Sequence, residues 1–157
     1  MSDDSRRHEQ RALSMPLTVV VALLLVVRIA ASLSQRPPLV RWQPPGAAAT
    51  AGRPVFYDFD AEWCAPCRRM DHDVFADEEI ARLLNEHFRP VRVVDRMQED
   101  GRNPPAVQLL IGRYHVAEFP TVIVVDAGTG AVLHRWSGYQ DKHSIRAALL
   151  AIASRHQ

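Results

Sequence analysis

The 157-residue sequence is long enough for one domain of ordinary size and a short additional segment. Its 19 basic and 18 acidic residues leave a formal net charge of +1, which argues against a nucleic-acid-binding surface. It contains two cysteines, so a scaffold held together by several disulfide bonds is excluded.

The first distinct segment is an apolar stretch close to the N-terminus. Residues 15–34 are almost continuously apolar and match the roughly 20 residues that a helix needs to cross a bilayer. Arginines within residues 1–14 favour a cytoplasmic position for that tail, so we predict a tail at 1–14 and a transmembrane anchor at 15–34. The alternative is a signal peptide cleaved near the small residues 30–32. Both interpretations place the rest of the chain outside the cytoplasm.

A proline-rich segment separates the apolar stretch from the rest of the sequence. Residues 35–53 contain four of the eleven prolines, which favours an extended linker that spaces a domain from the membrane. Within it, residues 40–42 are predicted to form a short edge strand. The folded domain is expected at residues 54–157.

Strand and helix patterns alternate along residues 54–157. In chain order they predict a strand at 54–60, helices at 64–72 and 77–87, a strand at 91–95, a loop at 97–103, a helix at 103–114, a strand at 119–126, a hairpin strand at 131–136 and a last helix from 141. Asp77 and Asp141 are expected to cap their helices. This order predicts an α/β fold with a central mixed sheet flanked by helices.

Cys64 and Cys67, the two cysteines, follow the first predicted strand at the start of a helix. Free backbone N–H groups and the helix dipole stabilise a thiolate at that position. The spacing also allows the two sulfurs to form a reversible disulfide. A zinc site would need two further ligands, and haem attachment would need histidine where Arg68 stands, so we predict no metal and no cofactor. The pattern therefore predicts a redox site.

Three separated motifs resemble the thioredoxin superfamily. Residues 58–67 resemble its active-site strand and turn, residues 119–121 its cis-proline loop, and residues 137–139 its third substrate-contacting loop. Further stretches are closer to the C-terminal periplasmic thioredoxin-like domain of the bacterial membrane thiol:disulfide interchange reductase: residues 40–44, 53–55 and 73–77. The resemblance implies a thioredoxin-like fold. One departure is Asp60, which stands where relatives usually carry an aromatic residue.

The resemblance also implies roles for the central residues. Cys64, with its sulfur exposed at the helix start, would attack a substrate disulfide, and Cys67, more buried, would resolve the mixed disulfide. Asp58, an acid inside an apolar strand, would accept the Cys67 proton, its pKa raised by burial. An ordinary strand-end acid is the alternative interpretation of Asp58.

Other residues are expected to contact the substrate. A cis Phe119–Pro120 bond, implied by the resemblance alone, would present the Phe119 backbone to an extended substrate segment. Trp63 would offer a flat apolar surface or would pack in the core. The remaining predicted contacts are Pro66, Thr121, Gly138 and Tyr139. Pro66 also suits the first turn of a helix, whether or not it touches the substrate.

The direction of electron flow is predicted from charge. Acidic residues at positions 58, 60 and 62 disfavour thiolates, and the Ala65-Pro66 dipeptide resembles reducing members of the superfamily. We expect a single-pass protein-disulfide reductase of the bacterial inner membrane with a periplasmic domain, or a soluble periplasmic one after signal cleavage. Its partners would be client proteins with disulfides and a separate electron donor, with no nucleic acid. Alternatives are an oxidase or isomerase, and a non-catalytic adaptor.

Overall fold

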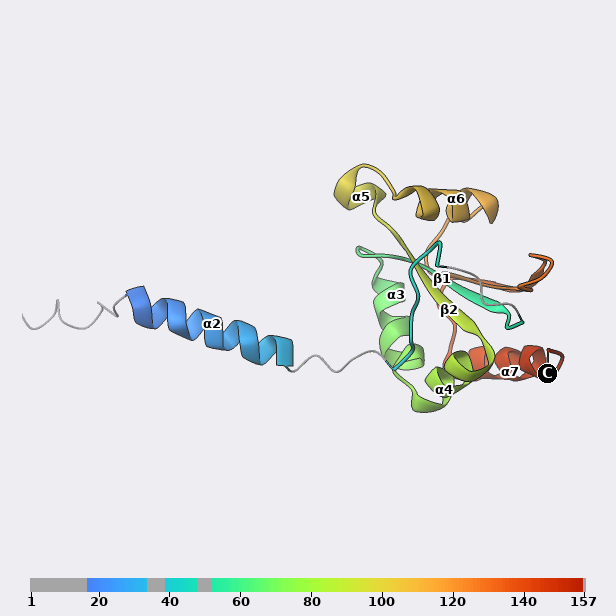
Figure 1. Ribbon diagram of the computed structural model, residues 1–157, viewed down its shortest axis with the longest axis horizontal. Helices are drawn as coiled ribbons and strands as arrows, with labels where there is room; N and C mark the ends of the chain where they lie inside the picture. Colours follow the sequence, from blue (N-terminus) through green and yellow to red (C-terminus); the bar gives the residue numbers. More distant parts are fainter. Residues whose placement is uncertain (1–16, 34–38, 48–51, 157) are drawn as a thin grey trace, which may run out of the picture. The chain divides into compact units, whose positions relative to one another are not determined.

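The computed structural model describes residues 17–33, 39–47 and 52–156 (Figure 1). The chain divides into two compact units, Met1–Pro37 and Pro38–Gln157. In the first unit, helix α2 covers Leu17–Leu33, and its side chains from Val19 to Val26 are exposed. Among the described residues, no helix combines the length and apolarity that crossing a membrane requires. The predicted tail at 1–14 and the ends of the predicted anchor lie outside the described residues.

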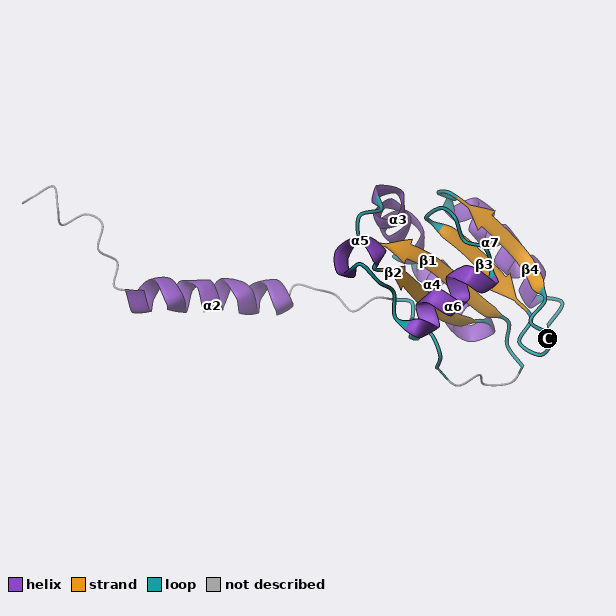
Figure 2. Ribbon diagram, turned by 90° about the horizontal axis from the view of Figure 1, so that it is seen from above, coloured by secondary structure: helices purple, strands orange, loops and turns teal. Residues whose placement is uncertain are grey.

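The second unit is built around a mixed sheet of four strands. They are β1 (Val55–Ala61), β2 (Arg89–Asp95), β3 (Thr121–Val125) and β4 (Val132–Ser137), in the order β2-β1-β3-β4 (Figure 2). Strand β1 is central and pairs parallel with β2 and antiparallel with β3, whereas β3 and β4 form an antiparallel hairpin. The mixed sheet and its hairpin confirm the sequence prediction.

Helices cover both faces of this sheet (Figures 1 and 2). They are α3 (Ala65–Met70), the π-helical turn η1 (Asp71–Phe75), α4 (Glu78–His87), α5 (Met97–Asp100), α6 (Pro105–Arg113) and α7 (Lys142–Ala153). Both predicted caps are confirmed. The Asp77 carboxylate accepts backbone N–H bonds at the start of α4, and the Asp141 carboxylate does the same for α7.

Two local predictions were wrong. The expected loop at 97–103 contains the short helix α5, whose first N–H group is held by the Asp95 carboxylate and which ends at Gly101 with a φ of 67°. The expected strand at 40–42 is absent from that described segment. Only Gln43 forms a bridge, with Val91 of β2, and the following Pro44 has no N–H group with which to extend the ladder.

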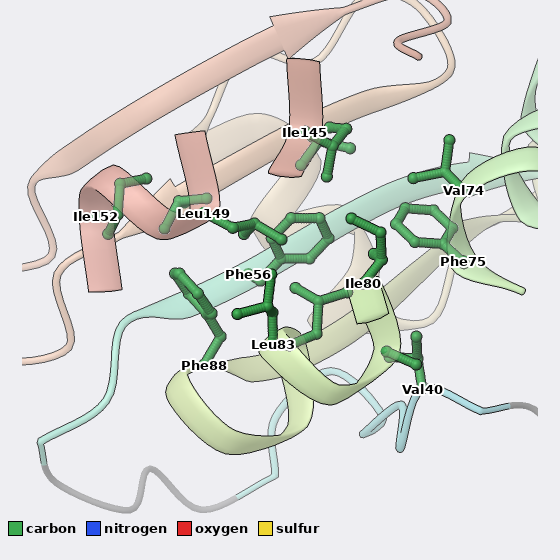
Figure 3. Close-up of a cluster of buried hydrophobic side chains, with 14 of the residues drawn as sticks. Val40, Phe56, Val74, Phe75, Ile80, Leu83, Phe88, Ile145, Leu149 and Ile152 are labelled. Carbon is green, nitrogen blue, oxygen red and sulfur yellow. The ribbon is translucent and has the colours of Figure 1, made fainter. Parts of the chain in front are cut away.

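Alternation along β1 divides its side chains between two apolar layers. Phe56 packs with α4, η1 and α7 through the cluster shown in Figure 3, whereas Val55 and Phe59 pack with α6 on the other face. Because side chains two residues apart share a face, Asp58 and Asp60 are directed to the same side as Phe56. The fold therefore places two carboxyl groups in succession on the strand that leads to the cysteines.

Candidate redox site

The two cysteines are joined by a disulfide bond at the start of α3. Cys64 is the N-cap residue of this helix, and its Sγ accepts a hydrogen bond of 3.2 Å from the backbone N–H of Cys67. Pro66 lies in the first turn, where its missing N–H leaves no intrahelical bond unmade. The predicted position of the pair at a helix N-terminus is confirmed.

The predicted difference in exposure between the cysteines is wrong for this disulfide form. Cys64 is 1% exposed and Cys67 is 4% exposed. The bonded sulfurs share one packed environment with Ala61, and Phe119 packs against it. Exposure therefore does not distinguish the attacking sulfur from the resolving one. The assignment of Cys64 as the attacking residue rests on its position at the helix N-terminus.

A second loop lies beside the disulfide and has the predicted cis bond between Phe119 and Pro120. The Trp63 ring meets the Phe119 ring edge to face at a centroid distance of 6.0 Å and is 48% exposed, so its core-packing alternative is excluded. The buried Thr121 hydroxyl donates to the Glu118 carbonyl oxygen at 2.8 Å. An exposed aromatic surface is thus formed next to the sulfurs.

The third predicted loop is fixed to the second. The Gly138 N–H donates to the Pro120 carbonyl oxygen at 2.8 Å, and Gly138 has a φ of 76°, which favours glycine. Tyr139 donates its hydroxyl to Asp73 at 3.1 Å, and the Arg69 guanidinium lies 4.5 Å from the centre of its ring. Tyr139 is therefore held against residues that follow the disulfide along α3 and η1.

Asp58 is almost completely buried, at 3% exposed, and forms an ion pair that the sequence analysis missed. Its Oδ2 atom accepts a hydrogen bond from Nε of Arg92 at 3.1 Å and lies 2.9 Å from Nη2 of the same guanidinium. Burial raises the pKa of Asp58 to about 7, although the Arg92 charge opposes that rise. The predicted burial and the predicted direction of the pKa change are both confirmed.

Arg92 connects several groups behind the disulfide. It is the register partner of Asp58 on the neighbouring strand β2, and it also forms an ion pair with Asp71 of η1. Its guanidinium lies 4.4 Å from the centre of the Trp42 ring. The available sequence signal was a charged residue within an otherwise apolar strand, between Val91 and Val93.

Asp60, whose negative charge was expected near the cysteines, lies beside both sulfurs. One of its carboxylate oxygens and the Sγ atoms of Cys64 and Cys67 all lie within 4.8 Å of one another. Burial raises the pKa of this half-buried acid, and Arg92 opposes the rise. The three groups have the chemistry of metal ligands, but a sulfur in a disulfide is not a thiolate, so the geometry of this form assigns no metal.

Glu62, the third acidic residue near the cysteines, has a different environment. Its exposed carboxylate is paired with Arg96, which also pairs with Asp100. The positive charge of Arg96 offsets the negative charge of Glu62. Negative charge close to the sulfurs therefore comes from the acidic residues of β1.

Comparisons with known proteins agree with this geometry. A family model for the thioredoxin-like domain matches residues 46–153. The thiol:disulfide interchange protein DsbD of Ralstonia nicotianae is 29% identical over 103 residues, which are 66% of this chain and 16% of that protein. The chain thus spans about a sixth of the length of this curated relative.

Solved structures give the same result. A thioredoxin from Thermus thermophilus is 28% identical and superimposes with a TM-score of 0.61, covering 74% of this chain and 89% of the thioredoxin. The DsbH oxidoreductase is 21% identical with a TM-score of 0.59, covering 83% of this chain and 99% of DsbH, which is a likeness of fold.

Proposed function

Since the chain belongs to the thioredoxin-like domain family, with a Cys64–Cys67 pair that supports thiol–disulfide oxidoreductase activity, we propose that it reduces protein disulfides outside the cytoplasm. One observation carries the proposal: the disulfide lies at a helix N-terminus, next to the cis-proline loop and to the Asp60 carboxylate of β1. The backbone of Phe119 would pair with an extended client segment that adds as a strand. The other proposed client contacts are Trp63, Pro66, Pro120, Gly138 and Tyr139, whereas Thr121, which is fully buried, is proposed to hold the loop in place.

The proposed reaction begins with the dithiol form of the site. The Cys64 thiolate attacks one sulfur of a client disulfide, which forms a mixed disulfide and releases one client thiolate. Cys67 then loses its proton and attacks Cys64 Sγ, which restores the Cys64–Cys67 disulfide and releases the second client sulfur. Two electrons pass to the client, and a separate donor returns them. Asp58, with a pKa near 7, is proposed to take part in the proton transfer at Cys67.

The half-buried Asp60 carboxylate beside the sulfurs supports the reducing direction. A negative charge within a few ångströms of a thiolate raises its free energy in a medium of low dielectric constant. The dithiol is then a weaker acid and gives up its electrons more readily. Asp60, within 4.8 Å of both sulfurs, is the described acid best placed to act in this way.

The reduction potential of the Cys64/Cys67 pair tests this direction. We expect a value near about −270 mV, because reducing members of the fold lie there, whereas strong oxidants lie near about −120 mV. Equilibration with a dithiothreitol or glutathione buffer of known potential gives the value. Reduction of insulin in the presence of dithiothreitol is the companion assay. An oxidising potential would favour the oxidase or isomerase, and an insulin rate at background would favour the non-catalytic adaptor.

The proposed location depends on the N-terminal segment. We propose that residues 15–34 anchor the domain in the bacterial inner membrane, because this apolar segment follows an arginine-bearing tail. A reporter enzyme that is active only after export, fused to the C-terminus, should be active. A cytoplasmic reporter at the same point should be inactive, and the reverse pattern would contradict the location. A shortened mature chain released from the membrane would support the signal-peptide alternative.

A further inference from the structure

Asp60 is held in a fixed position beside both sulfurs. Its Oδ1 accepts the N–H of Ala61 at 2.6 Å, which limits the rotation of the carboxylate. One of its carboxylate oxygens and the two sulfurs of Cys64 and Cys67 lie within 4.8 Å of one another. One bridging water spans such a distance, so a proton on either sulfur is within reach of the carboxylate.

We propose that the Asp60 carboxylate is the group that directly accepts the Cys67 proton when the mixed disulfide is resolved. This inference rests on the proposed exchange reaction. Arg92 donates one hydrogen bond to Oδ2 of Asp58, from Nε, and its Nη2 atom lies 2.9 Å from the same oxygen, so the Asp58 carboxyl is engaged in an ion pair with Arg92. Asp58 then acts as a positioning residue, through Asp60. It lies two residues before Asp60, on the same face of β1.

The proton balance of the step follows from this placement. In the mixed disulfide, Cys67 is a thiol and Asp60 a carboxylate. The S–H bond of Cys67 breaks as its proton moves to Asp60, and the resulting thiolate forms a bond to Cys64 Sγ. The bond between Cys64 and the client breaks, and the client sulfur leaves as a thiolate. Asp60 returns the proton to that thiolate or to water, so the acid is regenerated as a carboxylate.

The charges around Asp60 suit a group that gains and loses a proton. Arg92 of β2 and Arg68 of α3 favour its carboxylate, whereas Asp71 of η1 favours its acid form. The Asp60 carboxylate in turn opposes ionisation of Asp58 on the same strand β1. Burial is the largest influence and raises the pKa of Asp60, which brings this acid nearer to the pH at which a carboxylate can act as a base.

Stopped-flow reaction of the reduced protein with limiting 5,5′-dithiobis(2-nitrobenzoic acid) tests this inference, because each phase releases one coloured thiolate. The first phase reports attack on the reagent, and the second reports resolution of the mixed disulfide. Asp60→Asn should slow the second phase roughly 100-fold near neutral pH while changing the first by less than about threefold. Asp60→Glu should recover most of the rate. Glu79→Gln, which removes one negative charge at the ion pair between α4 and α7, is the matched control.

The sign of the change separates this role from a simple charge effect. If Asp60 acted only as a nearby charge, Asp60→Asn would make Cys67 more acidic and the second phase faster. A faster or unchanged second phase in Asp60→Asn would therefore overturn the inference. So would a result in which Asp58→Asn slows the second phase and Asp60→Asn does not. Should Asp60→Asn fail to fold by circular dichroism, Asp60→Ser is judged by the same criteria. Absence of both phases in the unmodified protein would instead contradict the proposed function.

Discussion

Replacing Cys64 by serine is expected to reduce thiol–disulfide exchange to the uncatalysed rate, whereas Cys67→Ser should trap clients as stable mixed disulfides. The physical reason is position, because Cys64 is the N-cap of α3 and its Sγ accepts the N–H of Cys67. A thiolate at that point is stabilised by free N–H groups and by the helix dipole. Cys67 lies inside the first turn and gains less from both.

Non-reducing electrophoresis after incubation with a disulfide-containing client distinguishes the two variants. A band that contains the protein and its client, and that disappears with dithiothreitol, is expected for Cys67→Ser only. The double variant Cys64→Ser/Cys67→Ser is the control for association with the client that requires neither cysteine. Because both sulfurs are buried in the disulfide form, the opposite outcome, trapping by Cys64→Ser, would show that α3 does not select the attacking sulfur.

Local patterns in the sequence predicted most of the sheet and the helix ends. Short apolar runs, alternating along the chain with helical patterns, located the strands. The carboxylates of Asp77 and Asp141 marked the starts of α4 and α7, because a cap acts within one turn of its own helix. The helix α5 was missed because residues 98–100 are polar and none of its residues is buried. Its start depends on the Asp95 carboxylate at the end of the preceding strand.

The electrostatic environment of the site could not be predicted in the same way. Asp58, Asp71 and Arg92 come from three elements, and their contact depends on the parallel register of β1 and β2. A buried acid was predictable from its apolar strand, but its partner was not. The same holds for Asp60, whose distance to the sulfurs depends on the turn that follows β1.

Folding stability of the disulfide form should fall as the pH rises from about 4 to about 7, and Asp58→Asn should remove a large part of that fall. The pKa of Asp58 is about 7 in the fold, compared with 3.8 for an ordinary aspartate. Between these values the folded chain holds a proton that the unfolded chain has released. Stability therefore decreases with rising pH, since the native state binds more protons than the unfolded state.

The effect is large because burial outweighs the ion pair with Arg92. At about 1.4 kcal/mol for each unit between the two pKa values, ionising Asp58 lowers the free energy of unfolding by on the order of 4 kcal/mol across this range. The amide of Asp58→Asn has no proton to lose, and its oxygen can still accept from Arg92, which keeps its contact with Asp71. The variant should therefore equal or exceed the parent in stability above neutral pH.

Urea unfolding without reductant, at a series of pH values from about 4 to about 8, measures this effect. The informative quantity is the difference between the parent and Asp58→Asn, because other acids with shifted pKa values contribute equally to both. That difference should grow with pH up to about 7 and then become constant. Glu79→Gln, the control with the same change in charge, should follow the parent throughout. A variant that is less stable than the parent by more than about 1 kcal/mol at every pH would mean that Asp58 holds the structure as an ionised partner of Arg92, and its part in proton transfer would then be wrong.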